Sequence, residues 1–83
     1  MSEAKIQAAI IKNLERDGYF VVKLIQTNKN GIPDLMAIRN GVVSFVEVKA
    51  GANKPTDLQL YRHKELTKSG CDIFVTNDQN FTL

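Results

Sequence analysis

Asp34, Glu47 and Lys49 place charges at the ends of the two most strand-like segments of this sequence. Asp34 stands between GIP and an apolar run, and Glu47 and Lys49 lie at the end of the run VVSFVEVK. Asp, Glu and Lys are poor strand residues, and burying their charges is costly. Three such residues at strand ends are therefore candidates for a chemical site.

The Asn-Gly pair at 40–41 determines how the two segments are paired. Asn-Gly is the strongest short hairpin signal, because both residues tolerate the left-handed backbone of a tight turn. Counting outward from this turn sets Asp34 opposite Glu47. Directly opposed residues have Cβ atoms about 4.5–5.5 Å apart on one face of a sheet. Lys49 lies two residues past Glu47 and projects from the same face, so two acids and one base gather at the end of a hairpin.

Paired carboxylates of this kind favour a divalent metal ion, because they repel each other unless a positive charge lies between them. Mg²⁺ takes oxygen ligands, keeps several waters and is often completed by substrate phosphate. Lys49 would lie beside the water or the phosphate, where it could orient or deprotonate the nucleophile. This arrangement predicts phosphodiester hydrolysis. The alternative is an ion pair at a fraying hairpin end, with no chemistry.

Residues of two expected helices can point at the same site. Glu3 lies on the apolar stripe of the first helix, although a favourable charge at the helix N-terminus would also explain it. Gln59 opens the second helix and could reach the water or the phosphate; with Thr56 it also has the form of a capping box. His63, four residues after Gln59, could approach the site or be an ordinary surface or partly buried histidine.

The order of the elements predicts an α/β fold with a mixed four-stranded sheet. We expect helices over 3–16 and from a cap at Thr56 to about Lys68, strands over 19–25, 34–39, 42–49 and 72–76, and a short tail. Short connections make the first three strands an antiparallel meander, and the second helix crosses over to a fourth strand parallel to the third. The second and third strands are apolar on both faces, so helices or a partner chain should cover both.

Length and composition predict one globular domain spanning residues 1–83. Hydrophobic residues make up 43% and charged residues 24%, as in ordinary soluble proteins. No apolar stretch is long enough to span a membrane, and the start MSEAK has no signal-peptide core. The single cysteine, Cys71, fits a reducing cytoplasm and is better explained as a small core residue than as a nucleophile. The net charge of +2 leans weakly toward a polyanionic partner.

The site residues, taken in order, resemble a known nuclease superfamily. GIPD, then EVK, then a Gln that opens the next helix, with a Glu at the start of the first helix, are similar to the PD-(D/E)xK nucleases. Within that superfamily, the small size and the spacing EVKAGANKPTDLQ resemble the VRR-NUC family, which includes stand-alone phage and bacterial proteins. The resemblance extends from Glu3 to Val75 and implies a restriction-endonuclease-like αβββαβ core.

The resemblance also implies a role for each site residue in a metal-dependent DNA endonuclease. The implied ligands of Mg²⁺ or Mn²⁺ are Asp34, Glu47 and the backbone carbonyl of Val48. Lys49 and Gln59 would serve the water and the phosphate, and Glu3 would complete the acidic cluster or help to hold a second metal. The family further implies selectivity for branched DNA, such as a four-way junction, and no small-molecule cofactor.

The remaining expectations concern DNA contacts and assembly. The preferred DNA contacts are Lys29, Asn30, Lys54 and Arg62, each of which is otherwise a solvated surface residue. Apolar residues spread around both helices predict a homodimer, against the alternative of a monomer with scattered apolar surface residues. The alternative function is a non-catalytic DNA-binding or interaction module on the same fold. The expected location is the cytoplasm, that of the host cell if a phage encodes the chain.

Overall fold

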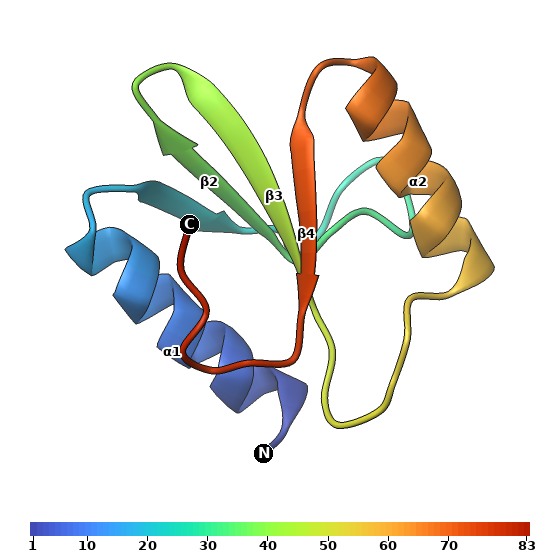
Figure 1. The fold of residues 1–83 in the computed structure, drawn as a ribbon. Helices are drawn as coiled ribbons and strands as arrows, with labels where there is room; N and C mark the ends of the chain where they lie inside the picture. The colour runs from blue at the N-terminus through green and yellow to red at the C-terminus, as the bar shows by residue number, and fades with distance from the viewer.

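The computed structural model describes all residues from Met1 to Leu83, as two helices and one sheet (Figure 1). In chain order the elements are α1 (Glu3–Arg16), β1 (Phe20–Lys23), β2 (Leu35–Arg39), β3 (Val42–Val48), α2 (Asp57–Lys68) and β4 (Asp72–Thr76). The four strands lie in the order β1-β2-β3-β4; the first three are antiparallel neighbours and β4 runs parallel to β3. The predicted α/β class and mixed sheet are confirmed, and the first strand is shorter than expected at both ends.

The β2–β3 hairpin has the register that its turn predicts. Asn40 and Gly41 both adopt left-handed φ angles, of 52° and 78°, as a tight two-residue hairpin requires. Arg39 pairs with Val42 and, at the far end, Leu35 pairs with Val46. The next position outward on each strand is occupied by Asp34 and Glu47, so the hairpin brings these two acids to one end of the sheet.

The hydrophobic core lies between α1 and one face of the sheet. It contains Ile6, Ile10 and Leu14 of α1 together with Leu35, Ala37, Val46 and Val48 of the strands. The chain after β4 also packs against this core through Phe81 and Leu83. Asn13 on α1 donates from Nδ2 to the carbonyl of Gln79 at 2.9 Å. The last residues, expected only as a short tail, are thus docked on α1.

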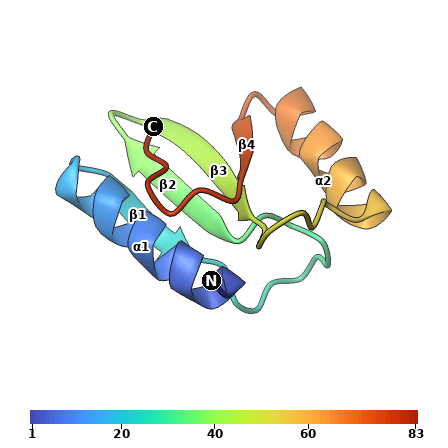
Figure 2. The same cartoon turned by 60° about the horizontal axis from the view of Figure 1, so that its bottom comes forward.

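The second face of the sheet is covered less completely. Figure 2 shows α1 alongside the sheet and α2 lying beyond the edge strand β4. No residue of α2 is buried, and Phe20 on β1 is 68% exposed. Helices alone therefore cover one face well and leave apolar side chains of the other face open. Neither helix is long and apolar enough to cross a membrane.

Candidate active site

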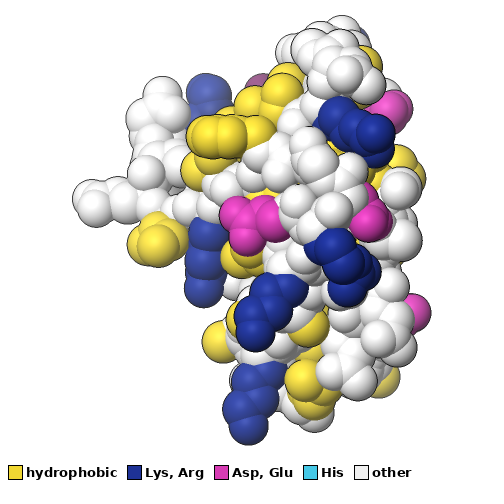
Figure 3. All heavy atoms as spheres, turned by 90° about the vertical axis from the view of Figure 1, so that its left-hand side faces the viewer, with side chains coloured by type: hydrophobic (Ala, Val, Ile, Leu, Met, Phe, Trp, Pro, Cys, Tyr) yellow, Lys and Arg dark blue, Asp and Glu magenta, His cyan; other side chains and the backbone are white.

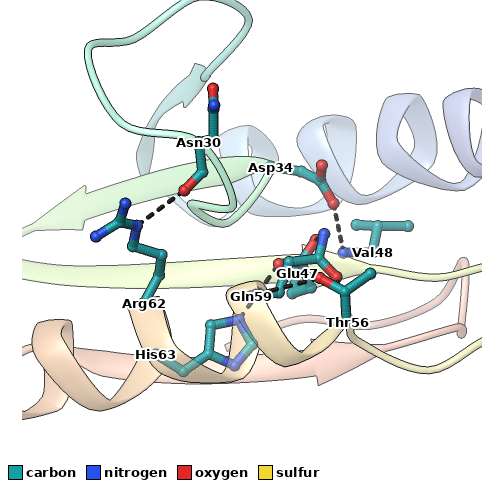
Figure 4. A network of polar contacts seen from close by, with 8 residues as sticks. All are labelled: Asn30, Asp34, Glu47, Val48, Thr56, Gln59, Arg62 and His63. Atoms are coloured by element: carbon teal, nitrogen blue, oxygen red, sulfur yellow. Dashed lines mark hydrogen bonds and ion pairs between the residues drawn. The ribbon is translucent and has the colours of Figure 1, made fainter.

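Asp34 and Glu47 meet at the end of the sheet where β2 begins and β3 ends (Figure 4). Glu47 lies on the central strand β3 and is 0% exposed. Asp34 is half-buried, and its Oδ2 accepts a hydrogen bond from the Val48 amide at 2.8 Å. This bond joins the Asp34 side chain to β3, the strand that carries Glu47. It therefore keeps the Asp34 carboxyl group close to that of Glu47.

The charged groups that affect Glu47 are the ones that the sequence predicted near it: Asp34, Lys49 and Glu3. The pKa of Glu47 is raised to about 8, mainly by burial and also by the neighbouring Asp34 carboxyl, while the Lys49 ammonium opposes the shift. The Glu3 carboxylate, at the start of α1, also acts to raise the Glu47 pKa. Glu3, Asp34 and Lys49 therefore all lie near enough to affect the pKa of Glu47, and that they act together as one site stays a prediction.

Gln59 combines the two roles that the sequence left as alternatives. Its backbone amide donates to Thr56 Oγ1 at 3.2 Å, and its side-chain Oε1 accepts from the Thr56 amide at 2.9 Å. This is the complete capping box. The other end of the same amide, Nε2, donates to Glu47 Oε2 at 3.4 Å. The cap therefore sets the direction in which Gln59 reaches into the site.

His63 lies one turn further along α2 and contacts the same carboxyl group. Its Nε2 lies 3.3 Å from Glu47 Oε1, and its side chain is 12% exposed. Burial, together with the nearby Lys49 ammonium, lowers the His63 pKa from its ordinary value. The ring is accordingly neutral at pH 7, and one of its nitrogens carries a hydrogen that can be donated.

The loop that leads into Asp34 is fastened to α2. Arg62 Nε donates to the carbonyl of Asn30 at 2.8 Å, and its Nη1 donates to Glu65 Oε1 at 2.7 Å. A Cβ built on Gly31 would lie 2.7 Å from Leu58 Cγ, so the loop and the helix touch closely. The Arg62 side chain, one of the expected DNA contacts, is only 20% exposed and already holds the loop.

Two comparisons with known proteins bear on this arrangement. The "Putative nuclease p44" of Acyrthosiphon pisum secondary endosymbiont phage 1 is 32% identical over 81 residues, which cover 96% of this chain and 87% of that protein. A solved structure described as a VRR_NUC domain matches with a TM-score of 0.78 and 36% identity, over 88% of this chain and 81% of that one. The chain belongs to the VRR-NUC nuclease family. No protein-family model matches the chain.

The donor set of this VRR-NUC protein fits a hard divalent cation. No three His, Cys, Asp or Glu side chains converge into a complete metal cage. Mg²⁺ does not need one, since one or two carboxylates suffice when water and substrate phosphate fill the other positions. The Glu47 carboxyl is buried beside Asp34, and burial is the main cause of its raised pKa. A bound cation would favour the ionised form of this carboxyl group.

The exposed members of the expected DNA contacts lie on the loops around the site. Lys29 and Asn30 are exposed on the loop before β2, and Lys54 is exposed on the loop before α2. Both loops lead into elements of the VRR-NUC site, to Asp34 and to Gln59 respectively. Their DNA contacts stay predictions, as does the Val48 carbonyl as a metal ligand.

His63 is the residue that sequence reasoning placed least firmly. Its signal was the spacing of four from Gln59, which puts both side chains on one helical face. That spacing could not tell whether the face turns toward the sheet, because α2 buries no apolar stripe that would orient it. The contact with Glu47 supplies the missing orientation.

Proposed function

We propose that this VRR-NUC protein is a metal-dependent DNA endonuclease that hydrolyses phosphodiester bonds at the Asp34–Glu47 site. The observation that carries the proposal is the fully buried Glu47, whose pKa of about 8 reflects its burial and the adjacent Asp34 carboxyl. A protein that only bound DNA would have no use for two acids held together, since they repel both each other and the phosphate backbone. Two hard oxygen donors beside a lysine are what metal-assisted phosphoryl chemistry needs.

Each residue of the site has a part in the proposed reaction. Asp34, Glu47 and the Val48 carbonyl would hold Mg²⁺ or Mn²⁺, with Glu3 completing the acidic cluster or helping to hold a second ion. The bound ion would polarise the scissile phosphate and lower the pKa of the attacking water. Lys49 holds its ammonium beside Glu47, where it offsets negative charge that develops on the phosphate. Gln59 donates a hydrogen bond to Glu47 from α2 and would help to orient the attacking water or the phosphate.

The proposed DNA contacts are mostly to phosphates. Lys29, Asn30 and Lys54 flank the site on exposed loops. On the face that Figure 3 shows, Lys and Arg side chains are spread out, with Asp and Glu side chains between them. Contacts of this type position DNA without reading its bases. Affinity should therefore fall steeply with salt and depend little on sequence. A preference for one short duplex sequence that survives high salt would contradict this part of the proposal.

We infer further that the nuclease acts as a homodimer on branched DNA. One chain supplies one cluster of site residues, whereas a branched substrate with paired strands calls for two cuts. The incompletely covered sheet face, with Phe20 and Val75 exposed, supports an interface with a second copy, and two-fold dimers are the commonest assembly. Sedimentation equilibrium measures this directly: a mass near the 9.3 kDa of one chain at micromolar concentration would remove the dimer.

The function is tested by cleavage assays on duplex, single-stranded, flap, splayed-arm and four-way-junction DNA, each with Mg²⁺ and with Mn²⁺. Asp34→Ala and Glu47→Ala should abolish cleavage and leave the fold intact, since each removes a metal ligand and relieves carboxylate repulsion. Lys49→Ala should lose most activity and keep DNA binding, because it acts mainly on the transition state. Lys68→Ala, an exposed lysine at the far end of α2, is the control for loss of one positive charge. Full cleavage by either acid variant would refute the proposed site.

A further inference from the structure

Each of the two carboxyl oxygens of Glu47 lies near a side-chain nitrogen of α2. Gln59 Nε2 lies 3.4 Å from Oε2, and His63 Nε2 lies 3.3 Å from Oε1. Gln59 and His63 are four residues apart, so successive turns of one helix hold the two ends of one carboxyl group. The remaining charged neighbours are Asp34 and Glu3, which repel an ionised Glu47, and Lys49, which attracts it.

Gln59 and His63 contact a buried carboxyl group, that of Glu47, so the loss of either contact should affect this group strongly. The Glu47 side chain is 1% exposed, so water cannot easily replace a missing donor. A buried carboxylate without hydrogen-bond donors is costly, and a hydrogen bond shielded from water is stronger than an exposed one. Gln59 is oriented by its own capping box, which leaves the orientation of the Oε1 side of Glu47 to His63.

We propose that His63 is a positioning residue for Glu47: its Nε2–H holds Oε1 while Gln59 holds Oε2, and together they fix the plane of the carboxylate that faces Asp34. This inference rests on the proposed metal-dependent function, because the oriented carboxylate matters for binding the cation. Groups that orient a metal ligand from behind typically change metal affinity by about 10–100-fold when they are lost. His63 therefore acts on the site through Glu47 and touches neither metal nor DNA.

The first test is metal binding without DNA, read from the rise in melting temperature as Mn²⁺ is titrated. His63→Leu keeps bulk and removes the donor, and it should weaken the apparent Mn²⁺ affinity by about tenfold. His63→Gln places an amide nitrogen near the position of Nε2 and should stay within about threefold of the parent chain, as expected if the donor is what matters. Thr67→Leu, an exposed position one turn further along the same face, should bind Mn²⁺ as the parent does.

The outcomes separate this inference from the function on which it rests. If the parent chain shows no Mn²⁺-dependent shift and cuts no DNA, the proposed function fails. If the parent responds but His63→Leu binds Mn²⁺ equally well, the positioning role is overturned. Equal weakening in the Leu and Gln variants would also overturn it, because His63 would then act through its shape alone.

A second measurement needs no variant. His63 is the only histidine of the chain, so a long-range ¹H–¹⁵N spectrum of the untagged protein reports its ring without ambiguity. In the Mg²⁺-loaded protein the neutral ring should carry its hydrogen on Nε2, the nitrogen that faces Glu47. A ring protonated on Nδ1 alone would leave Nε2 without a hydrogen to donate, and this result would overturn the proposal even if His63→Leu failed to fold.

Discussion

The two helices of this protein are attached to the same sheet by different forces. α1 buries Ile6, Ile10 and Leu14 in the core, whereas no residue of α2 is fully buried. The identified ties of α2 to the site are polar instead: Gln59 and His63 reach Glu47, and Arg62 reaches the carbonyl of Asn30. One helix is held mainly by apolar contact and the other largely by hydrogen bonds.

Because of this difference, the two helices contribute differently to the stability of the fold and to the geometry of the site. Apolar burial is non-directional and scales with area, so α1 stabilises the sheet whatever the charge state of the site. Hydrogen bonds depend on distance and angle, so the position of α2 should be more sensitive than that of α1 to the arrangement of Glu47 and of the loop before β2. The helix that contributes less to stability is thus the one whose position is coupled to the site.

The largest effect should come from breaking the apolar contact of α1. Leu14→Ala removes a fully buried side chain and should lower the free energy of unfolding by about 2–5 kcal/mol. The matched change on α2, Leu60→Ala, alters a side chain that is 46% exposed and should cost less than about 0.5 kcal/mol. Urea denaturation measures both. Equal losses would mean that α2 contributes to the core as α1 does.

The close approach of α2 to the loop before β2 gives the next effect. Gly31→Ala would put a Cβ 2.7 Å from Leu58 Cγ at a φ of +80°, and we expect a loss of about 2–3 kcal/mol from backbone strain and overpacking. Gly41→Ala has a similar φ of +78° and no neighbour within 4 Å, so it should cost only the backbone strain, about 1 kcal/mol. Adding Leu58→Ala to Gly31→Ala should recover most of the difference between them. No recovery would mean that α2 does not press on this loop.

The sequence predicted the parts of the molecule that are encoded locally. The Asn-Gly turn at 40–41 set the hairpin register, and with it the pairing of Asp34 and Glu47. The capping box of Thr56 and Gln59 marked the start of α2, and the stripe through Ile10 and Leu14 marked the core side of α1. Each of these signals lies within one element or one turn.

What the sequence did not predict depends on contacts between distant segments. Arg62 carries an ordinary surface charge in sequence, and only the folded chain shows that it holds the carbonyl of Asn30, 32 residues away. His63 was ambiguous for the same reason, since a helix without a buried apolar stripe does not reveal which side faces the sheet. The docking of Phe81 on the core likewise required the path of the chain after β4.

A third prediction concerns how the free energy of unfolding depends on pH in the absence of metal, at the site that α2 contacts. The Glu47 pKa is raised from 4.5 to about 8, so the folded protein binds this proton more tightly than the unfolded chain does. The resulting stability is complete below pH 4.5 and is lost as pH rises through about 8. The lowered pKa of His63 acts in the opposite sense, but only below its ordinary value of 6.5, which leaves pH 6.5 to 8 for Glu47 alone.

Over that window the free energy of unfolding should fall by about 1–2 kcal/mol. Glu47→Gln cannot ionise and should abolish most of the fall, whereas Leu14→Ala should lower stability by the same amount at both pH values. Saturating Mn²⁺ should reverse the trend, because the cation binds the ionised carboxylate. A parent chain whose stability does not change between pH 6.5 and 8 would contradict the raised pKa of Glu47.

The smallest effect is the most discriminating, because the two helices carry comparable caps. Ser2 accepts from the Lys5 amide at the start of α1, and Thr56 accepts from the Gln59 amide at the start of α2. Ser2→Ala and Thr56→Ala should each cost about 1 kcal/mol of stability, the usual value of an N-cap. Their effects on Mn²⁺ affinity should differ, because the Thr56 cap also aims Gln59 at Glu47, whereas the Ser2 cap supports only the more distant charge of Glu3. Melting curves with and without Mn²⁺ give both quantities for both variants. Similar losses of Mn²⁺ affinity in the two variants would mean that both helices position the site equally. The conclusion that α2 is the helix coupled to the site would then be wrong.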